Sequence, residues 1–266
     1  MNGAFVVKYA WSQVRAARLH REGVLLQRLK ALAPGLRLPQ VIALHDNPVT
    51  VITQYLIADP LSWGVGSDLR GERLDHVSGR LADFLVTLHG LPATEVLRGL
   101  PTVNPTAQAD TTMLRARYRR LVDERRAHQV LAWCDWVDAV LSTEQFQAVV
   151  VHGDLHGYNQ LWDFNSAELV AVLDFEECGL GDPNFDFRYL AGNSASTNLM
   201  MSVASAYERH SSARFRLDRA MAWHVLTVLG DALWRTEAGV DLPGGGDASS
   251  YVDELQQRLH EVGTSP

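Results

Sequence analysis

Cysteine is scarce in this sequence and does not occur in a redox or disulfide-like arrangement. Cys134 and Cys178 are the two cysteines among 266 residues, and they form no C-x-x-C pair. Such usage favours two buried thiols over a disulfide and is typical of a reducing compartment. We therefore expect a cytoplasmic protein.

Long apolar runs and an excess of positive charge are also missing. The sequence has no run of about 18 uninterrupted apolar residues, so we expect no membrane partner. Its N-terminal residues show no signal-peptide pattern. The net charge is −7 and the pI is about 5.8, whereas a nucleic-acid partner requires a basic surface to neutralise phosphates. We therefore expect no nucleic-acid polymer, and the composition fits a cytoplasmic enzyme.

Hydrophobic residues make up 47% of the chain, enough for one large domain or two packed lobes. The pattern predicts a small N-terminal strand–helix–hairpin unit, residues 1–57, and a larger helical unit, residues 58–266. The first unit reads as strand, helix and antiparallel hairpin, with Ser12 as helix N-cap: 4–10, 11–32, 40–46 and 50–57. Further helices are expected at 71–92, 110–128, 129–141 and 218–236, with short strands at 146–152 and 168–175. The fold class is α+β.

The segment HGDLHGYN, residues 152–159, combines acid, imidazole and amide side chains directly after an expected strand. Asn159 follows Asp154 by five positions, and Asp174 ends the next expected strand. An oxygen pair such as Asn159 and Asp174 suits Mg²⁺, which prefers oxygen ligands and keeps waters. Asp154 is then free to accept a proton from an attacking hydroxyl. The order H-x-D-x-x-x-x-N followed by an Asp is the pattern of phosphoryl transfer.

Three segments together resemble the aminoglycoside phosphotransferase and choline kinase group of protein-kinase-like small-molecule kinases. They are LADFLVTLHGLP at 81–92, HGDLHGYN at 152–159 and LDFEECGLGDPNFDF at 173–187. The resemblance implies a protein-kinase-like bilobal fold with a small antiparallel-sheet N-lobe and a larger helical C-lobe. It also implies ATP and Mg²⁺ as cofactors. The implied acceptor is a hydroxyl of a small molecule: an aminoglycoside-like antibiotic, an amino alcohol or a sugar.

The resemblance assigns roles to individual residues. Asp154 would be the catalytic base, and Asn159 with Asp174 would hold Mg²⁺. Lys8 would contact the α- and β-phosphates, with Glu22 fixing its position. For Lys8 and Glu22, an ordinary solvent-exposed charge is the alternative interpretation.

The remaining predicted site residues bind adenine or support the loop. The backbone carbonyl of Gln54 and the amide of Leu56 would bond adenine. We interpret His152 and His156 as hydrogen-bonding braces of the loop rather than metal ligands. Asp186 would brace the same loop, although a helix cap is the alternative for an acid in GDPNFD. Asp231 and Glu237 are candidate ammonium-binding acids, with helix-surface charge as the alternative.

The N-terminal region departs from the pattern of this group. Only MNGAFVV precedes Lys8, where the group has two further strands and a phosphate-covering loop. A late start, a shortened N-lobe and a catalytically impaired nucleotide-binding pseudokinase are the open explanations. A sheet edge left exposed beside strand 4–10 would suit pairing with a second copy, so a homodimer is a further hypothesis.

A binuclear metallophosphatase is the competing enzyme class. GDLHG at 153–157 resembles the opening motif of that class. The match then fails, because Phe185 stands where the second motif requires Asp, and no later Gly-His-x-His cluster occurs. The small-molecule kinase therefore remains the favoured prediction.

Overall fold

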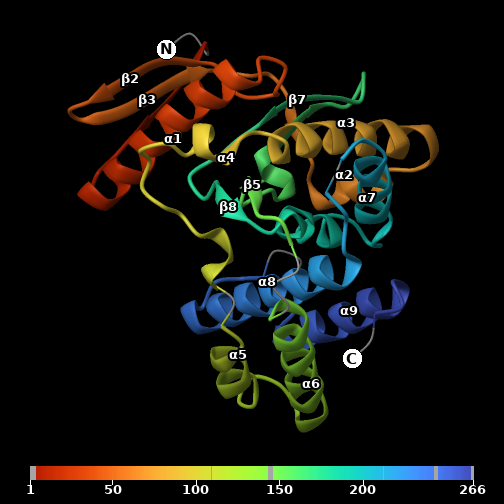
Figure 1. Cartoon of the computed structure of the whole chain (residues 1–266). Helices are drawn as coiled ribbons and strands as arrows, with labels where there is room; N and C mark the ends of the chain where they lie inside the picture. Colours follow the sequence, from red (N-terminus) through yellow and green to blue (C-terminus); the bar gives the residue numbers. More distant parts are fainter. Residues whose placement is uncertain (1–3, 109, 143–145, 212, 243–244, 265–266) are drawn as a thin grey trace.

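The computed structural model describes residues 4–108, 110–142, 146–211, 213–242 and 245–264. Within these residues the N-terminal sheet consists of three antiparallel strands in the order β1-β3-β2. The strands are β1 (Phe5–Tyr9), β2 (Val41–Asp46) and β3 (Val49–Gln54). The sheet lies at one end of the molecule (Figure 1).

Helix α1 (Gln13–Leu32) follows β1 and packs against the sheet. The Ser12 hydroxyl accepts a hydrogen bond from the amide of Arg15 at 3.3 Å, so Ser12 is the N-cap that the sequence predicts. Leu25 and Leu29 are fully buried on the inner face of this helix. The predicted strand, helix and hairpin of the N-terminal unit are thus present.

The second strand of the hairpin is shorter than predicted. We expected residues 50–57, but β3 ends at Gln54. Its neighbour β1 begins at Phe5, which lies opposite Gln54 in the register. The ladder stops where the neighbouring strand stops, and a run of residues with high strand propensity does not reveal that limit.

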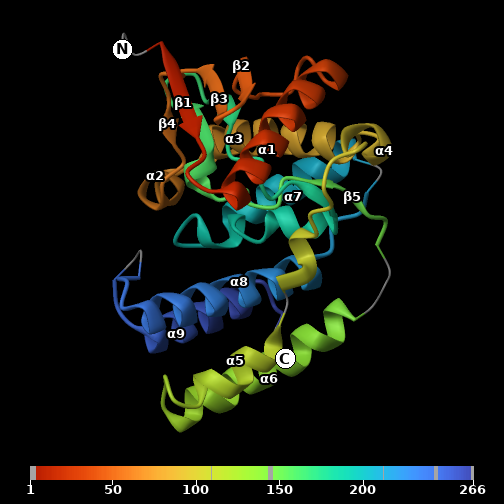
Figure 2. The ribbon, with the colours of Figure 1, turned by 90° about the vertical axis from the view of Figure 1, so that its left-hand side faces the viewer.

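The rest of the chain is mainly helical and continues away from the sheet in layers (Figures 1 and 2). The α-helices are α2 (Trp63–Asp68), α3 (Gly71–His89), α4 (Ala93–Val96), α5 (Thr111–Tyr118), α6 (Glu124–Leu141), α7 (Asn198–His210), α8 (Leu217–Ala238) and α9 (Ala248–Glu261). Short 3₁₀-helices are η1 (Pro105–Gln108), η2 (Gly157–Asn159), η3 (Pro183–Phe187) and η4 (Leu190–Gly192). Helices α5 and α6 lie at the end opposite the sheet (Figure 2). Nowhere in the described part of the chain is a helix both long and apolar enough to cross a membrane.

The predicted helices 110–128 and 129–141 are wrong in their boundary. The first helix, α5, ends at Tyr118, whose hydroxyl donates to the carbonyl of Leu229 at 2.9 Å. The second, α6, starts at Glu124 because Asp123 caps it by accepting from the amide of Arg126 at 2.9 Å. The segment contains no Gly or Pro, so the apolar pattern looked continuous across the break.

Two small sheets lie within the helical part of the described chain. One pairs β4 (Asp59–Pro60), β6 (Gln160–Asp163) and β7 (Glu168–Val172), and the other pairs β5 (Val149–Val151) with β8 (Gly179–Gly181). The predicted strands 146–152 and 168–175 are therefore each shortened. Because β5 pairs with β8 and β6 with β7, the loop after β5 and the loop after β7 are brought side by side.

Candidate active site

The two loops that carry the motif residues are joined directly to each other. We name them for the roles that the sequence predicts: the catalytic loop, residues 152–159, follows β5, and the metal loop, residues 173–178, follows β7. The amide of Leu173 donates to the carbonyl of Asn159 at 2.8 Å. The ring Nε2 of His152 bonds the carbonyl of Leu173 at 2.9 Å. Two segments that are separate in sequence thus share one backbone framework.

The carboxylate of Asp186 binds the backbone at the start of the catalytic loop. Its carboxylate is fully buried and accepts from the amides of His152 and Gly153 at 2.8 and 2.9 Å. The Nε2 of His89 lies 3.1 Å from the same carboxylate. Burial opposes ionisation, but the hydrogen bond and charge of His89 outweigh it, so the pKa of Asp186 lies below its ordinary value. Asp186 thus makes bracing contacts with the catalytic loop.

His152 is fully buried and hydrogen-bonded on both ring nitrogens. Its Nδ1 accepts from the amide of Asp154 at 3.1 Å, so its Nε2 carries the proton that is donated to Leu173. Burial lowers the pKa of His152, which favours this neutral form. Both nitrogens are therefore occupied by backbone groups, and neither is directed to a metal.

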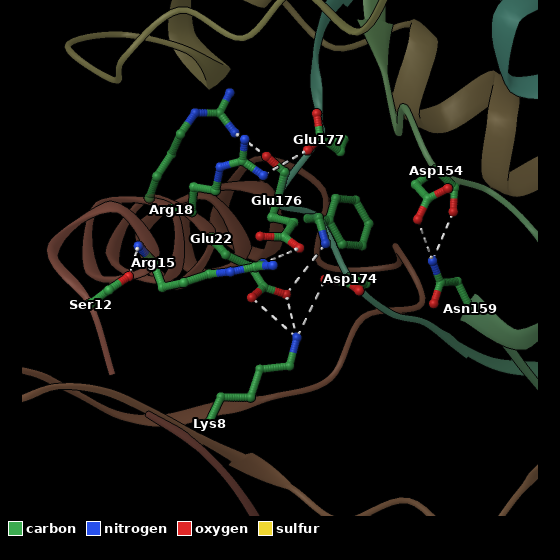
Figure 3. Close-up of polar contacts among 12 residues, drawn as sticks. Lys8, Ser12, Arg15, Arg18, Glu22, Asp154, Asn159, Asp174, Glu176 and Glu177 are labelled. Atoms are coloured by element: carbon green, nitrogen blue, oxygen red, sulfur yellow. Dashed lines mark hydrogen bonds and ion pairs between the residues drawn. The ribbon is translucent and has the colours of Figure 1, made fainter. Parts of the chain in front are cut away.

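Asp154 and Asn159 face each other across the catalytic loop (Figure 3). The Asn159 amide nitrogen donates to the Asp154 carbonyl at 2.8 Å and to its carboxylate at 3.3 Å. The Asn159 amide oxygen is thereby turned away from Asp154, as Figure 3 shows. The Asp154 side chain is 30% exposed, so its carboxylate is accessible from outside.

His156 and Tyr189 flank the Asp154 carboxylate. The Nε2 of His156 lies 3.6 Å from Asp154, and the His156 ring meets the Tyr189 ring edge-on. Burial, together with the neighbouring Asp154, raises the pKa of Tyr189 to about 12, so its hydroxyl stays protonated. The His156 side chain therefore contacts the reactive carboxylate, while its backbone amide and carbonyl form the turn to Asp154 and Asn159.

Lys8 reaches from β1 to acids on two other segments (Figure 3). Its Nζ lies 3.0 and 3.2 Å from the two Glu22 oxygens and 3.5 Å from Asp174. Glu22 also accepts from the amide of Phe175 at 3.3 Å. Burial would lower the pKa of Lys8, but the carboxylates of Glu22 and Asp174 raise it above its ordinary value. Lys8 is therefore a stable cation beside the metal loop.

Asp174 adopts a left-handed backbone conformation, with φ of 62°. Non-glycine residues are uncommon there, although Asp is among those that tolerate it. Asp174 lies two residues after the end of β7, with its carboxylate 3.5 Å from the Lys8 ammonium. Asp174 is adjacent in sequence to Leu173, which bonds Asn159, so one carboxylate and one amide oxygen are offered by neighbouring loops.

The donors present suit Mg²⁺ better than a transition metal. Mg²⁺ takes one or two protein oxygens and completes its shell with water and substrate phosphates. The part of the chain that the structure describes contains no group of three or more His, Cys, Asp or Glu side chains able to hold a metal. A binuclear metallophosphatase centre requires such a group, so the donor set disfavours that alternative.

Comparison with known proteins agrees with this geometry. The model of a family described as "Phosphotransferase enzyme family" matches residues 2–225. The chain belongs to this family.

Individual relatives lie at moderate distance. Viomycin phosphotransferase of Streptomyces vinaceus is 29% identical over 194 residues, which cover 68% of this chain and 64% of that protein. The N-acetylmuramate/N-acetylglucosamine kinase of Caulobacter vibrioides is 26% identical over 161 residues, covering 55% of this chain and 44% of that kinase. The chain thus spans about half to two thirds of the length of these curated relatives.

The fold is that of the aminoglycoside phosphotransferases. A GDP complex of aminoglycoside 2'-phosphotransferase-IIIa superposes with a TM-score of 0.73 at 18% identity, covering 96% of this chain and 86% of that one. The predicted α+β bilobal fold with a small sheet-containing N-lobe and a helical C-lobe is therefore confirmed. The boundary between residues 57 and 58 stays a proposal.

Two residues predicted for this site lie apart from the loops. Gln54 is the last residue of β3, where its amide donates to the carbonyl of Gln40 at 2.9 Å. Leu56 follows in the segment that leads to β4 and is half-buried. Among the contacts of the described residues, none joins either one to Lys8 or Asp154, so their adenine-binding role stays a prediction.

Arg188 contacts the catalytic loop, and the sequence reasoning missed it. Its buried guanidinium donates to the carbonyl of Gly153 at 2.7 Å and to that of Phe185 at 3.0 Å. It lies between the Phe185 and Tyr189 rings, 3.6 and 4.1 Å from their centroids. One feature of the sequence could have indicated it: Arg188 follows Asp186 by two positions, and Asp186 was predicted to brace the same loop.

Proposed function

We propose that this protein transfers the γ-phosphoryl group of ATP to a hydroxyl of a small molecule. The observation that carries the proposal is the convergence of Asp154, Asn159, Asp174 and the Lys8–Glu22 pair from separate segments. A carboxylate poised as base, two oxygen donors and a fixed cation are the parts that phosphoryl transfer requires. Family membership and the nucleotide complexes of related structures support the same conclusion.

Each residue has a defined task in this proposal. Asp154 accepts the hydroxyl proton as the acceptor oxygen bonds to the γ-phosphorus and the bond from that phosphorus to ADP breaks. Lys8 pairs with the α- and β-phosphates, and Glu22 keeps its ammonium directed into the cleft. Asn159 and Asp174 would hold Mg²⁺, which when bound neutralises phosphate charge. Gln54 and Leu56 would offer backbone groups to adenine.

Two ion pairs at the C-terminal helices bear on the predicted ammonium-binding acids. Asp231 bonds Arg235 at 2.8 Å, and Glu237 bonds Arg117 at 2.5 Å. Both acids are thus neutralised by arginines of the same protein, which favours the surface-charge interpretation over ammonium binding. We propose a small-molecule hydroxyl of an antibiotic, amino alcohol or sugar, and a cytoplasmic site of action.

An ATP-consumption assay over a panel of hydroxyl acceptors tests the function. We expect Mg²⁺-dependent turnover with at least one acceptor, and a decrease of about 10²–10⁴-fold in Asp154→Asn. The matched control is Asp163→Asn, the same change at an acid that closes the β6–β7 turn by accepting from Asn165 and Ser166. Near-normal turnover in Asp154→Asn would contradict the proposal. Mg-ATP binding without turnover on any acceptor would favour the pseudokinase alternative.

A further inference from the structure

Arg21 lies immediately before Glu22 on α1 and is buried, with 3% of its surface exposed. Its guanidinium reaches three backbone carbonyls outside the helix. The acceptors are Pro101 at 3.0 Å, Glu176 at 3.3 Å and Cys178 at 2.5 Å. Two of these carbonyls belong to the metal loop, and the third belongs to the segment after α4.

The metal loop contains one turn, in which the amide of Cys178 donates to the carbonyl of Phe175 at 3.1 Å. It lies between the end of β7 and the start of β8, where strand pairing is interrupted. Glu22 accepts from the amide of Phe175, while Arg21 donates to the carbonyls of Glu176 and Cys178. Two successive residues of α1 therefore bind three of the four loop residues that follow Asp174, namely Phe175, Glu176 and Cys178. The rigid fork of a guanidinium can satisfy several carbonyls at once, whereas an ammonium is a single point donor.

The same contacts extend to the catalytic loop through Glu177. A Cβ placed on Gly153 would lie 2.4 Å from the Glu177 carbonyl oxygen, so the two backbones are in close contact. Gly153 has φ of 86°, a conformation that a side chain would also disfavour. Gly153 immediately precedes Asp154. Arg21 bonds the residues on either side of Glu177. It therefore fixes the backbone of Glu177, against which Gly153 and the Asp154 loop pack.

We propose that Arg21 is a positioning residue that fixes Asp174 and Asp154 relative to each other and to Lys8. Its effect on turnover rests on the proposed function, whereas its effect on the loops does not. Loss of the clamp leaves the residues after Asp174 held by the Glu22 bond to Phe175, by the turn bond from Cys178 to Phe175 and by partly exposed ion pairs of Arg15 with Glu176 and Arg18 with Glu177. It also removes the buried bonds on either side of Glu177, whose backbone lies against Gly153. Catalytic groups must be placed to within a fraction of an ångström, so a small displacement lowers turnover strongly.

Arg21→Met tests this inference, because methionine keeps much of the length and apolar stem but donates no hydrogen bond. Arg21→Lys is the second variant and restores charge without the fork. The matched control is Arg28→Met on the same helix. Arg28 also donates to two backbone carbonyls, those of Val96 and Arg98, both at 2.8 Å, but neither belongs to the metal loop.

Two measurements are made on the full chain. Amide hydrogen exchange of residues 174–179 is followed without nucleotide, and turnover is followed with Mg-ATP and an active acceptor. We expect faster exchange of that segment and a turnover loss of about 10–100-fold in Arg21→Met, the range typical of residues that orient a metal ligand. Arg21→Lys should fall between Arg21→Met and the wild type. Arg28→Met should leave both readouts within about twofold of the wild type if its only role is to anchor α1.

Wild-type exchange and turnover in a folded Arg21→Met would overturn the inference. Equal losses in Arg28→Met would also overturn it, because general anchoring of α1 would then explain the effect. If Arg21→Met fails to fold, Arg21→Lys decides by the same two readouts. If the wild type turns over no acceptor, the proposed function fails, while hydrogen exchange still decides whether Arg21 holds the metal loop.

Discussion

Strand β1 and the catalytic loop each supply a residue to the site, but they hold it in opposite ways. All five side chains of β1 are exposed, and Lys8 itself is 44% exposed. In the catalytic loop, His152 and the supporting Asp186 are fully buried and bonded to backbone. The position of the Lys8 charge on the strand is therefore set by ion pairs. The backbone of the catalytic loop is instead held by hydrogen bonds to buried side chains.

This contrast separates stability from catalysis. A buried charge that loses its hydrogen-bond partners destabilises the fold, because the groups left behind cannot reach water. An ion pair with one exposed member contributes less, and the Lys8–Glu22 pair is of this kind, with 44% of the Lys8 side chain and 6% of the Glu22 side chain exposed. Substitutions of the buried residues that bind the catalytic loop should therefore affect both stability and turnover strongly, while Lys8 substitutions on β1 should affect mainly turnover.

The largest effect is expected for Asp186→Ala. The change leaves the amides of His152 and Gly153 and the ring of His89 without their buried acceptor. We expect a loss of about 3–5 kcal/mol in the free energy of unfolding, measured by urea denaturation, together with loss of turnover.

Asp154→Ala is the comparison for Asp186→Ala, because both remove a carboxylate from the same loop region. The Asp154 side chain is partly exposed and accepts one long bond, from the Asn159 side chain at 3.3 Å, which also donates to the Asp154 carbonyl, so we expect turnover to be lost with stability little changed. Equal losses of unfolding free energy in the two variants would show that the bonds of Asp186 to the loop backbone do not stabilise the loop.

Lys8→Met should give the next largest effect, mainly on turnover. Removing one fixed charge from a site that stabilises developing charge typically costs about 10²–10³-fold in rate. A smaller loss of stability should accompany it, because the change leaves the buried Glu22 carboxylate without its cation. Lys30→Met is a matched control, since Lys8 and Lys30 are the two lysines of the sequence and Lys30 donates to the carbonyl of Pro34 at 2.7 Å. Steady-state kinetics in Mg-ATP should separate them, and a stability loss in Lys8→Met as large as that of Asp186→Ala would contradict the comparison.

The pH dependence of the unfolding free energy should come from buried histidines. His224 is buried in α8, bonds the carbonyl of Arg188 at 2.7 Å, and burial lowers its pKa to about 3. The unfolded chain has the ordinary pKa of about 6.5 and binds the proton first, so stability is full above about pH 6.5 and falls on acidification.

The expected slope is about 1.4 kcal/mol per pH unit for each such histidine between about pH 6 and pH 4. His152, whose pKa burial also lowers, contributes in the same direction. Urea denaturation over this range should show a slope reduced by about one proton in His224→Asn. An unchanged slope would mean that His224 does not stay neutral in the folded protein.

Local sequence signals were sufficient for much of the fold and of the site. Ser12, the 4–10 strand and the 11–32 helix follow from propensity and capping, which act over a few residues. Asp154, Asn159 and Asp174 follow from their spacing around two short strands. The left-handed Asp174 has no local signal of its own, and it lies within the predicted strand 168–175, which in the structure ends at Val172.

The contacts that organise the site were beyond sequence reasoning for a physical reason. Arg21 bonds carbonyls 80 to 157 positions away, and Arg188 bonds Gly153 across 35 positions. Every residue has a backbone carbonyl, so the sequence does not show which carbonyl a given arginine will bond. The ends of α5 and α6 were missed in part because the tertiary bond from Tyr118 to Leu229 lies at the break.

The smallest effect is expected on the outer surface of β1. Tyr9 is 67% exposed, so Tyr9→Ser should change the free energy of unfolding by less than about 0.5 kcal/mol in dilute solution. Light scattering over a concentration series also tests the predicted homodimer, because β1 is an edge strand of its sheet. A wild-type dimer that Tyr9→Ser weakens would place the second copy against this strand. A strictly monomeric wild type would rule that dimer out and leave β1 as a solvent-exposed edge whose only fixed side chain is Lys8.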